Sequence, residues 1–252
     1  MPETISIVIP AYNEENRLPA TLRALTAYAG AHPEIAEVVV VDDGSRDNTA
    51  AVVRAYAHTD PRVRLVGYSA NGGKGYAIRR GVIETRGDLV LISDADLSTP
   101  IDELETLRSA LADHEIVIGS RALDESLVTV RQSWYRQTMG KTFNRIMRAI
   151  TGVPFLDTQC GFKLLTRDAA RTVFTESTVD RFAYDVEMLI LASRHGFRVA
   201  EVPVRWVNSP DSRVSIVRDA SRMLFDLLAV RGRLGRYRTR PAPGHDPRDQ
   251  KR

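Results

Sequence analysis

Cysteine is almost missing from this sequence: Cys160 is the only one among 252 residues. No disulfide can form within the chain, and a reducing compartment is the simplest environment for it. No charge-free stretch reaches the roughly 18 apolar residues that a membrane-spanning helix needs. The segment Met1–Pro10 lacks a basic region and a long apolar one, so we expect no signal peptide. These absences predict a cytoplasmic protein, one that can still lie at the inner face of a membrane.

The composition that remains is that of a folded domain with a sizeable core, with 43% hydrophobic and 27% charged residues. The net charge of +3 says little about partners. We expect one domain over residues 1–236, made of an N-terminal half, 1–122, and a C-terminal half, 123–236. Residues 237–252 are rich in Pro, Gly and Arg without periodicity, which predicts a disordered basic tail.

Short apolar runs alternate with segments of helical spacing along the first half. The expected strands are 5–9, 38–41, 63–66, 89–92 and 116–118, and the expected helices are 14–29, 48–56, 75–84 and 102–112. This alternation predicts an α/β fold with a mostly parallel sheet and helices on both faces. In the second half we expect helices at 131–150, 184–195 and 216–230, a loop at 155–165 leading into a strand, and a strand at 198–206.

Polar groups follow three of the expected strands. They are Pro10-Ala11-Tyr12-Asn13-Glu14, Asp42-Asp43-Gly44-Ser45 and Ser93-Asp94-Ala95-Asp96. Because the carboxyl ends of parallel strands meet at one edge of a sheet, where ligands bind in such folds, we expect the chemistry there.

Two carboxylates at that edge suggest a metal site. Asp94 and Asp96 are two residues apart on an extended segment, so their side chains point the same way. Such a pair attracts Mg²⁺ or Mn²⁺, which in turn binds a diphosphate. A pair of solvated turn aspartates is the alternative, and the position directly after the apolar run Leu89–Ile92 favours the metal site. Asp42 is well placed to cap the next helix, whereas Asp43 could hydrogen-bond a base or ribose.

Asn71-Gly72-Gly73-Lys74-Gly75 is a glycine-rich turn ahead of an expected helix. Its backbone N–H groups, the Lys74 ammonium and the helix N-terminus could hold phosphate oxygens. The spacing does not match a Walker A loop, and an ordinary helix-entry turn is the alternative.

Together these motifs resemble the inverting family 2 glycosyltransferases of the GT-A fold, over a likeness running from about Ile5 to about Arg222. A narrower resemblance, to the dolichyl-phosphate β-glucosyltransferase branch, rests on Asp94–Pro100, Gly119-Ser120-Arg121 and Asp157–Lys163. Ser98 and Cys160 stand where the related mannosyltransferases usually have Gln and Ser, which favours UDP-glucose over GDP-mannose. Cys160 itself is expected to pack in its loop.

The resemblance implies a role for each matching residue. The donor-binding residues would be Pro10, Ala11, Tyr12, Glu14, Asp43, Lys74, Asp94 and Ala95. Asp94 and Asp96 would hold Mg²⁺ or Mn²⁺ with help from Ser98. The catalytic residues would be Asp96, Asp157 and Arg121, with Asp157 on the acceptor side. Acceptor or phosphate groups would contact Arg131, Arg213 and Ser215. The half 1–122 would bind the nucleotide sugar and the half 123–236 the acceptor.

The implied reaction is displacement at the anomeric carbon with inversion, from UDP-glucose to a polyprenyl phosphate. A phosphate acceptor is already charged and needs little base assistance, whereas a hydroxyl acceptor would require a base, for which Asp157, Asp185 and Glu187 are candidates. For Asp185 and Glu187, capping or structural salt bridges are equally open. The alternatives are a GDP-mannose-dependent enzyme, a hydroxyl acceptor, or a non-catalytic nucleotide-binding scaffold.

Basic residues are concentrated in the second half. Arg131, Lys141, Arg145 and Arg148 accompany apolar residues at helical spacing, and five arginines lie between residues 231 and 240. This pattern favours an anionic lipid surface, with an ordinary packed helix as the alternative. A nucleic-acid partner is disfavoured because the donor motifs account for far more of the chain, and a membrane-protein partner remains open.

Overall fold

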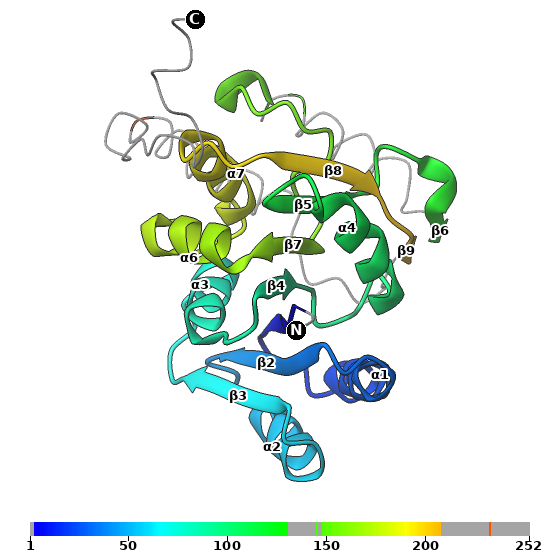
Figure 1. Cartoon of the computed structure of the whole chain (residues 1–252). Helices are drawn as coiled ribbons and strands as arrows, with labels where there is room; N and C mark the ends of the chain where they lie inside the picture. Colours follow the sequence, from blue (N-terminus) through cyan, green and yellow to red (C-terminus); the bar gives the residue numbers. More distant parts are fainter. Residues whose placement is uncertain (1–2, 131–144, 146–147, 208–231, 233–252) are drawn as a thin grey trace, which may run out of the picture.

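The computed structural model describes residues 3–130, 145, 148–207 and 232. Within them a seven-stranded sheet has the order β3-β2-β1-β4-β7-β5-β8 (Figure 1). Its strands are β1 (Ile5–Ala11), β2 (Ile35–Asp43), β3 (Val63–Tyr68), β4 (Leu89–Ile92), β5 (Ile116–Ser120), β7 (Lys163–Thr166) and β8 (Val199–Pro203). The short strands β6 (Val128–Val130) and β9 (Trp206–Val207) form a second sheet.

Six α-helices pack on the described sheet. They are α1 (Leu18–Ala31), α2 (Thr49–Thr59), α3 (Lys74–Glu84), α4 (Leu104–Leu111), α6 (Arg167–Glu176) and α7 (Tyr184–Arg194), with 3₁₀ turns η1 (Ile101–Glu103) and η2 (Glu125–Leu127). One apolar cluster joins α3, α6 and α7 to one face of the sheet, and the other joins α1, α2 and α4 to the opposite face. The predicted α/β fold with helices on both faces is therefore confirmed.

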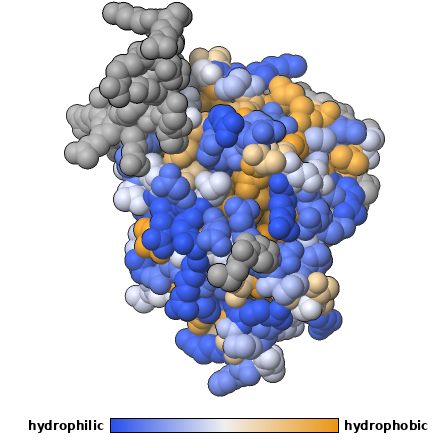
Figure 2. All heavy atoms as spheres, in the orientation of Figure 1, coloured by the Kyte–Doolittle hydropathy of each residue, from blue (hydrophilic) through white to orange (hydrophobic). Residues whose placement is uncertain are grey.

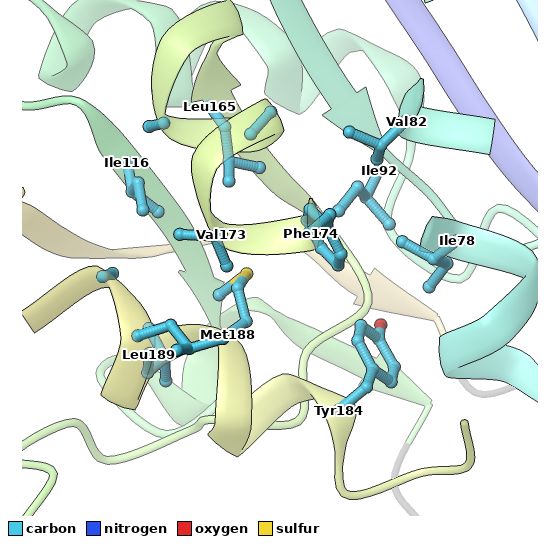
Figure 3. Close-up of a cluster of buried hydrophobic side chains, with 14 of the residues drawn as sticks. Ile78, Val82, Ile92, Ile116, Leu165, Val173, Phe174, Tyr184, Met188 and Leu189 are labelled. Carbon is cyan, nitrogen blue, oxygen red and sulfur yellow. The ribbon is translucent and has the colours of Figure 1, made fainter. Parts of the chain in front are cut away.

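Successive side chains along the central strands point to opposite faces of the sheet, and this alternation produces the two clusters. Ile5, Ile7 and Ile9 face α1 and α4, whereas Val8 between them faces α3. Figure 3 shows the cluster that includes α3, α6 and α7, in which Phe174 of α6 and Tyr184 of α7 lie against the sheet. Side chains on the face seen in Figure 2 are mostly hydrophilic, and apolar ones gather in its upper part, near β8.

The sheet is parallel except at β7. That strand runs antiparallel between β4 and β5, while the pairs β1–β2, β1–β4, β2–β3 and β5–β8 are parallel. Because β7 runs against its neighbours, the segment before it arrives at the edge where β4 and β5 end. The loop at 157–162 is thereby brought to the carboxyl edge of the sheet.

Several element boundaries differ from the sequence prediction. Helix α1 begins at Leu18 instead of Glu14, because residues 15–17 form a turn and Pro19 suits only the first helical turn. Helix α6 has no counterpart in the prediction, and the strand expected at 198–206 is divided into β8 and β9. Of the helix expected at 131–150, residues 145 and 148–150 are described and helical. The expected helix at 216–230 and the tail at 237–252 lie outside the described residues.

Candidate active site

The three polar groups that follow strands meet at one edge, as the sequence predicts. Strand β1 pairs with both β2 and β4 in parallel register, so that Ala11 lies beside Asp42 and Val8 beside Ile92. The residues just beyond these strands therefore surround one position. The glycine-rich turn, which precedes α3, and the loop at 157–162, which precedes β7, complete the surroundings.

Asp94 lies at the centre of this edge, with its side chain 36% exposed. The Lys74 ammonium donates to its Oδ1 at 2.6 Å. Burial raises the pKa of the Asp94 carboxyl, but the charges of Lys74, Lys163 and Arg121 outweigh it and hold that pKa below its usual value. For Lys74, burial lowers the pKa of the ammonium, but the surrounding carboxylates, chiefly Asp94, outweigh this effect and raise the pKa above its usual value. Asp94 and Lys74 are thus both charged at neutral pH.

Asp96 is held by its own short segment. Its Oδ1 accepts hydrogen bonds from the backbone N–H of Ser98 at 3.0 Å and from the Ser98 hydroxyl at 2.9 Å. Leu97 between them has a φ of 46°, which is rare for a side chain of this kind. The strained residue lets the chain fold back so that Ser98 reaches Asp96. Asp96 and Ser98, expected together at a metal ion, are therefore adjacent.

Arg17 was missed by the sequence analysis and lies at the site. Its Nε and Nη2 donate to the two carboxylate oxygens of Glu14 at 2.7 and 2.5 Å, and its Nη1 lies 3.6 Å from Asp96 Oδ2. Glu14, expected to line the nucleoside pocket, therefore uses both carboxylate oxygens to bind Arg17. No local signal marked Arg17, because its role depends on a contact across 79 residues of sequence between positions 17 and 96.

Asp43 organises the glycine-rich turn. Its carboxylate accepts from the backbone N–H groups of Gly72, at 2.6 Å, and Gly73, at 2.9 Å, and from the Tyr68 hydroxyl at 2.7 Å. The side-chain amide of Asn71 adds a bond of 2.9 Å. The N–H groups of Gly72 and Gly73 were expected to face phosphate oxygens, and in this structure they face Asp43 instead.

Arg121 and Asp157 form a bidentate ion pair. Nε and Nη2 of Arg121 donate to the carboxylate at 2.6 and 2.8 Å, and the Arg121 backbone N–H adds a third bond at 3.0 Å. The guanidinium also lies 5.5 Å from the Trp206 ring centre. Burial raises the pKa of the Asp157 carboxyl, but Arg121 dominates and holds it below the usual value. Both carboxylate oxygens of Asp157 are thus engaged by Arg121.

The other two candidate bases are buried, and each has partners in the structure. The Lys163 ammonium, itself completely buried, donates to Asp185 at 2.5 Å. Glu187 is also completely buried and accepts from the Ser177 hydroxyl and from the backbone N–H groups of residues 178 and 179. Both carboxylates make structural contacts, and a structural role is the alternative that the sequence left open for Asp185 and Glu187.

The remaining expected site residues divide into two groups. Pro10, Ala11, Tyr12 and Ala95 lie at the same edge, and Tyr12 is exposed. The carbonyl of Ala95 is fixed by the Thr21 hydroxyl at 2.6 Å. Arg131, Arg213 and Ser215 lie outside the described residues.

The residues present fit a hard divalent cation. Asp94 and Asp96 are both reachable from solvent, and Ser98 supplies a hydroxyl beside Asp96. Carboxylate and hydroxyl oxygens are the ligands that Mg²⁺ and Mn²⁺ prefer, and Mg²⁺ usually takes one or two protein carboxylates and completes its shell with water and substrate phosphates.

The structure thus combines a doubly covered α/β sheet with two aspartates and a lysine at its carboxyl edge. The glycosyl transferase family 2 model matches residues 6–174, and the chain belongs to that family. It is a glycosyltransferase.

Relatives support this membership, and a solved structure shares the fold. A dolichyl-phosphate beta-glucosyltransferase of Trichomonas vaginalis is 40% identical over 237 residues, covering 89% of this chain and 70% of the relative. The enzyme of the same name from Homo sapiens is 35% identical, with coverages of 90% and 74%. Glucosyl-3-phosphoglycerate synthase from Mycobacterium tuberculosis, solved with UDP, shares the fold with a TM-score of 0.70 at 21% identity, covering 92% of this chain and 81% of that one.

In the part of the chain that the structure describes, no helix is long and apolar enough to cross a membrane.

Proposed function

We propose that this glycosyltransferase moves glucose from UDP-glucose to a polyprenyl phosphate with inversion, using Mg²⁺ or Mn²⁺. The names of its relatives, dolichyl-phosphate beta-glucosyltransferases that are 31–40% identical, support the sugar and the acceptor class. A fold neighbour crystallised with Mn²⁺, UDP-glucose and phosphoglyceric acid supports the metal and the donor.

One structural observation carries the choice of acceptor: each of the three candidate bases already has a partner within the described part of the chain. Asp157 pairs with Arg121, Asp185 pairs with Lys163, and Glu187 accepts several N–H and O–H donors. A hydroxyl acceptor requires a group that removes its proton. A phosphate monoester, with a second pKa of about 6, is mostly a dianion at pH 7 and attacks without one. The site therefore suits a phosphate acceptor.

The chain's own residues then have defined tasks. Asp94 and Asp96, with Ser98, would hold the metal ion, which supplies positive charge to the leaving diphosphate. Lys74 lies beside Asp94 and would neutralise a phosphate oxygen. Arg121, fixed by Asp157 and Trp206, would orient the acceptor phosphate. Catalysis would rest on positioning and charge, because the reacting groups need no proton removed.

The deciding experiment is a transfer assay with Mg²⁺, a panel of radiolabelled nucleotide sugars and a short-chain polyprenyl phosphate. We expect label in the organic phase from UDP-glucose alone, lost on chelation of the metal and in Asp96→Ala. Label from GDP-mannose would overturn the sugar assignment. Metal-dependent donor binding with transfer only to hydroxyl compounds would overturn the acceptor, and donor binding without any turnover would favour the scaffold.

We further propose that the protein lies on the inner face of an anionic membrane, held by the basic residues between 131 and 148 and between 231 and 240. Sedimentation with vesicles of phosphatidylcholine, with and without anionic lipid, tests this. Binding only to anionic vesicles, weakened by salt, is expected. Equal binding to both would contradict an electrostatic attachment.

A further inference from the structure

Each carboxylate of the aspartate pair has its own cation. Lys74 lies 2.6 Å from Asp94 Oδ1, and Arg17 Nη1 lies 3.6 Å from Asp96 Oδ2. The Arg17 side chain is 22% exposed and that of Asp96 20%, so both are partly buried and water screens the attraction between their charges only in part. Each of the two expected metal ligands, Asp94 and Asp96, therefore has a protein cation close to its carboxylate.

Contacts with other residues fix the position of the Arg17 side chain near Asp96. Two of its nitrogens are fixed on Glu14 at 2.7 and 2.5 Å, and the backbone N–H of Glu14 is fixed in turn on the Thr49 hydroxyl at 2.7 Å. The guanidinium is therefore oriented by a buried carboxylate on a secured backbone. Such support is typical of a residue whose position matters to a neighbouring site.

A metal ion that enters alone would meet these two cations. It would add two positive charges to a site where Lys74 already pairs with Asp94 and where Arg17, paired with Glu14, also lies near Asp96. A metal ion that enters with a diphosphate brings its own negative charge, which Arg17 could share. The arrangement thus opposes the metal alone and favours the metal together with a nucleotide.

We propose that Arg17 couples metal binding to binding of the nucleoside diphosphate. It lowers the affinity of the aspartate pair for the free metal and raises the affinity for the diphosphate once the metal is present. This inference rests on the proposed function, since it assumes a nucleoside diphosphate donor.

The test compares Mn²⁺ binding with nucleotide binding in the full chain, without turnover. Free Mn²⁺ is measured by electron paramagnetic resonance in the absence of nucleotide, and UDP binding by calorimetry at saturating Mn²⁺. For Arg17→Gln we expect Mn²⁺ alone to bind about five-fold tighter, the size of a partly exposed ion pair, and UDP to bind about ten-fold weaker, the size of a lost charge-assisted hydrogen bond. Opposite signs are the signature, because a merely structural role would weaken both.

A second variant and a control keep the inference falsifiable. Glu14→Gln keeps the charge of Arg17 but weakens the contact that holds the guanidinium on residue 14, so the guanidinium can move toward Asp96. Mn²⁺ alone should then bind more weakly. This variant decides the question if Arg17→Gln does not fold. Arg62→Gln is the matched control, since Arg62 makes the same bidentate pair with Asp60, at 2.8 and 2.6 Å, near the start of β3. It should change neither affinity.

Unchanged or weaker Mn²⁺ binding in a folded Arg17→Gln protein would overturn the coupling. The failure of the proposed function would look different, because wild-type protein with Mn²⁺ would then fail to bind UDP while the Mn²⁺ measurements remained interpretable.

Discussion

The backbone of Gly161 lies directly against the carboxylate of Asp94. A Cβ on Gly161 would stand 2.2 Å from Asp94 Oδ2 and 2.5 Å from Cγ, far inside van der Waals contact. The two residues come together because β7, which follows Gly161, pairs antiparallel with β4, which precedes Asp94. Only glycine permits this approach, so Gly161 determines where the Asp94 carboxylate can lie.

Gly161→Ala should therefore displace Asp94 and weaken metal binding and transfer by at least about 100-fold, the cost expected for a misplaced reacting group. The measurement is Mn²⁺ affinity together with kcat/KM. Gly30→Ala is the matched control, because no atom lies within 4 Å of a Cβ there and Gly30 sits in helix α1. The control should keep activity and gain up to about 1 kcal/mol of stability. Full activity in Gly161→Ala would contradict the tight approach.

The glycine-rich turn should depend on Asp43 in a graded way. Tyr68→Phe removes one donor to the Asp43 carboxylate and should cost about 1 kcal/mol of unfolding free energy. Asp43→Asn turns an amide N–H toward the donors of Gly72 and Gly73 and should cost more, about 2 kcal/mol, and raise the KM for the donor. Denaturant unfolding and donor-saturation kinetics measure both effects. Equal effects of the two variants would mean that the backbone bonds to Asp43 contribute little.

Most of this edge could be predicted from sequence, because local patterns determine it. Apolar runs mark β1, β2 and β4, and the polar residues that follow them must meet when the strands are parallel. Gly161 and Arg17 could not be assigned in this way. The place of Gly161 depends on the antiparallel pairing of β7 with β4, and that of Arg17 on the turn before α1, and neither arrangement leaves a periodic signal. The same holds for Glu187, whose spacing alone did not separate a base from a buried anchor.

Glu187 should matter to stability more than to chemistry. Its carboxylate holds the loop at 177–179, whose Val179 carbonyl would stand 2.4 Å from a Cβ on Gly75, so the loop packs closely on the start of α3. Glu187→Gln replaces an acceptor with a donor facing other donors and should cost about 2–3 kcal/mol of unfolding free energy. Glu84→Gln, at an exposed position on α3, should cost less than about 0.5 kcal/mol. A kcat loss in Glu187→Gln without destabilisation would restore Glu187 as a candidate base.

The Arg121–Asp157 pair predicts a specific dependence on pH. The pKa of Asp157 is lower in the folded protein than its usual value, so the pair stabilises the fold fully above the unfolded pKa, about 3.9. That contribution is lost as the pH falls below about 4 toward the folded pKa, where the carboxylate takes up a proton. Asp157→Asn lacks it at every pH and should be about 2–3 kcal/mol less stable at neutral pH, since it leaves Arg121 without its buried partner. The difference in Tm between wild type and Asp157→Asn should stay constant from pH 5 to 8 and shrink below pH 4. A difference that instead changes between pH 6 and 8, together with a matching limb in the pH profile of kcat/KM, would show that Asp157 titrates near neutrality and acts as a base after all.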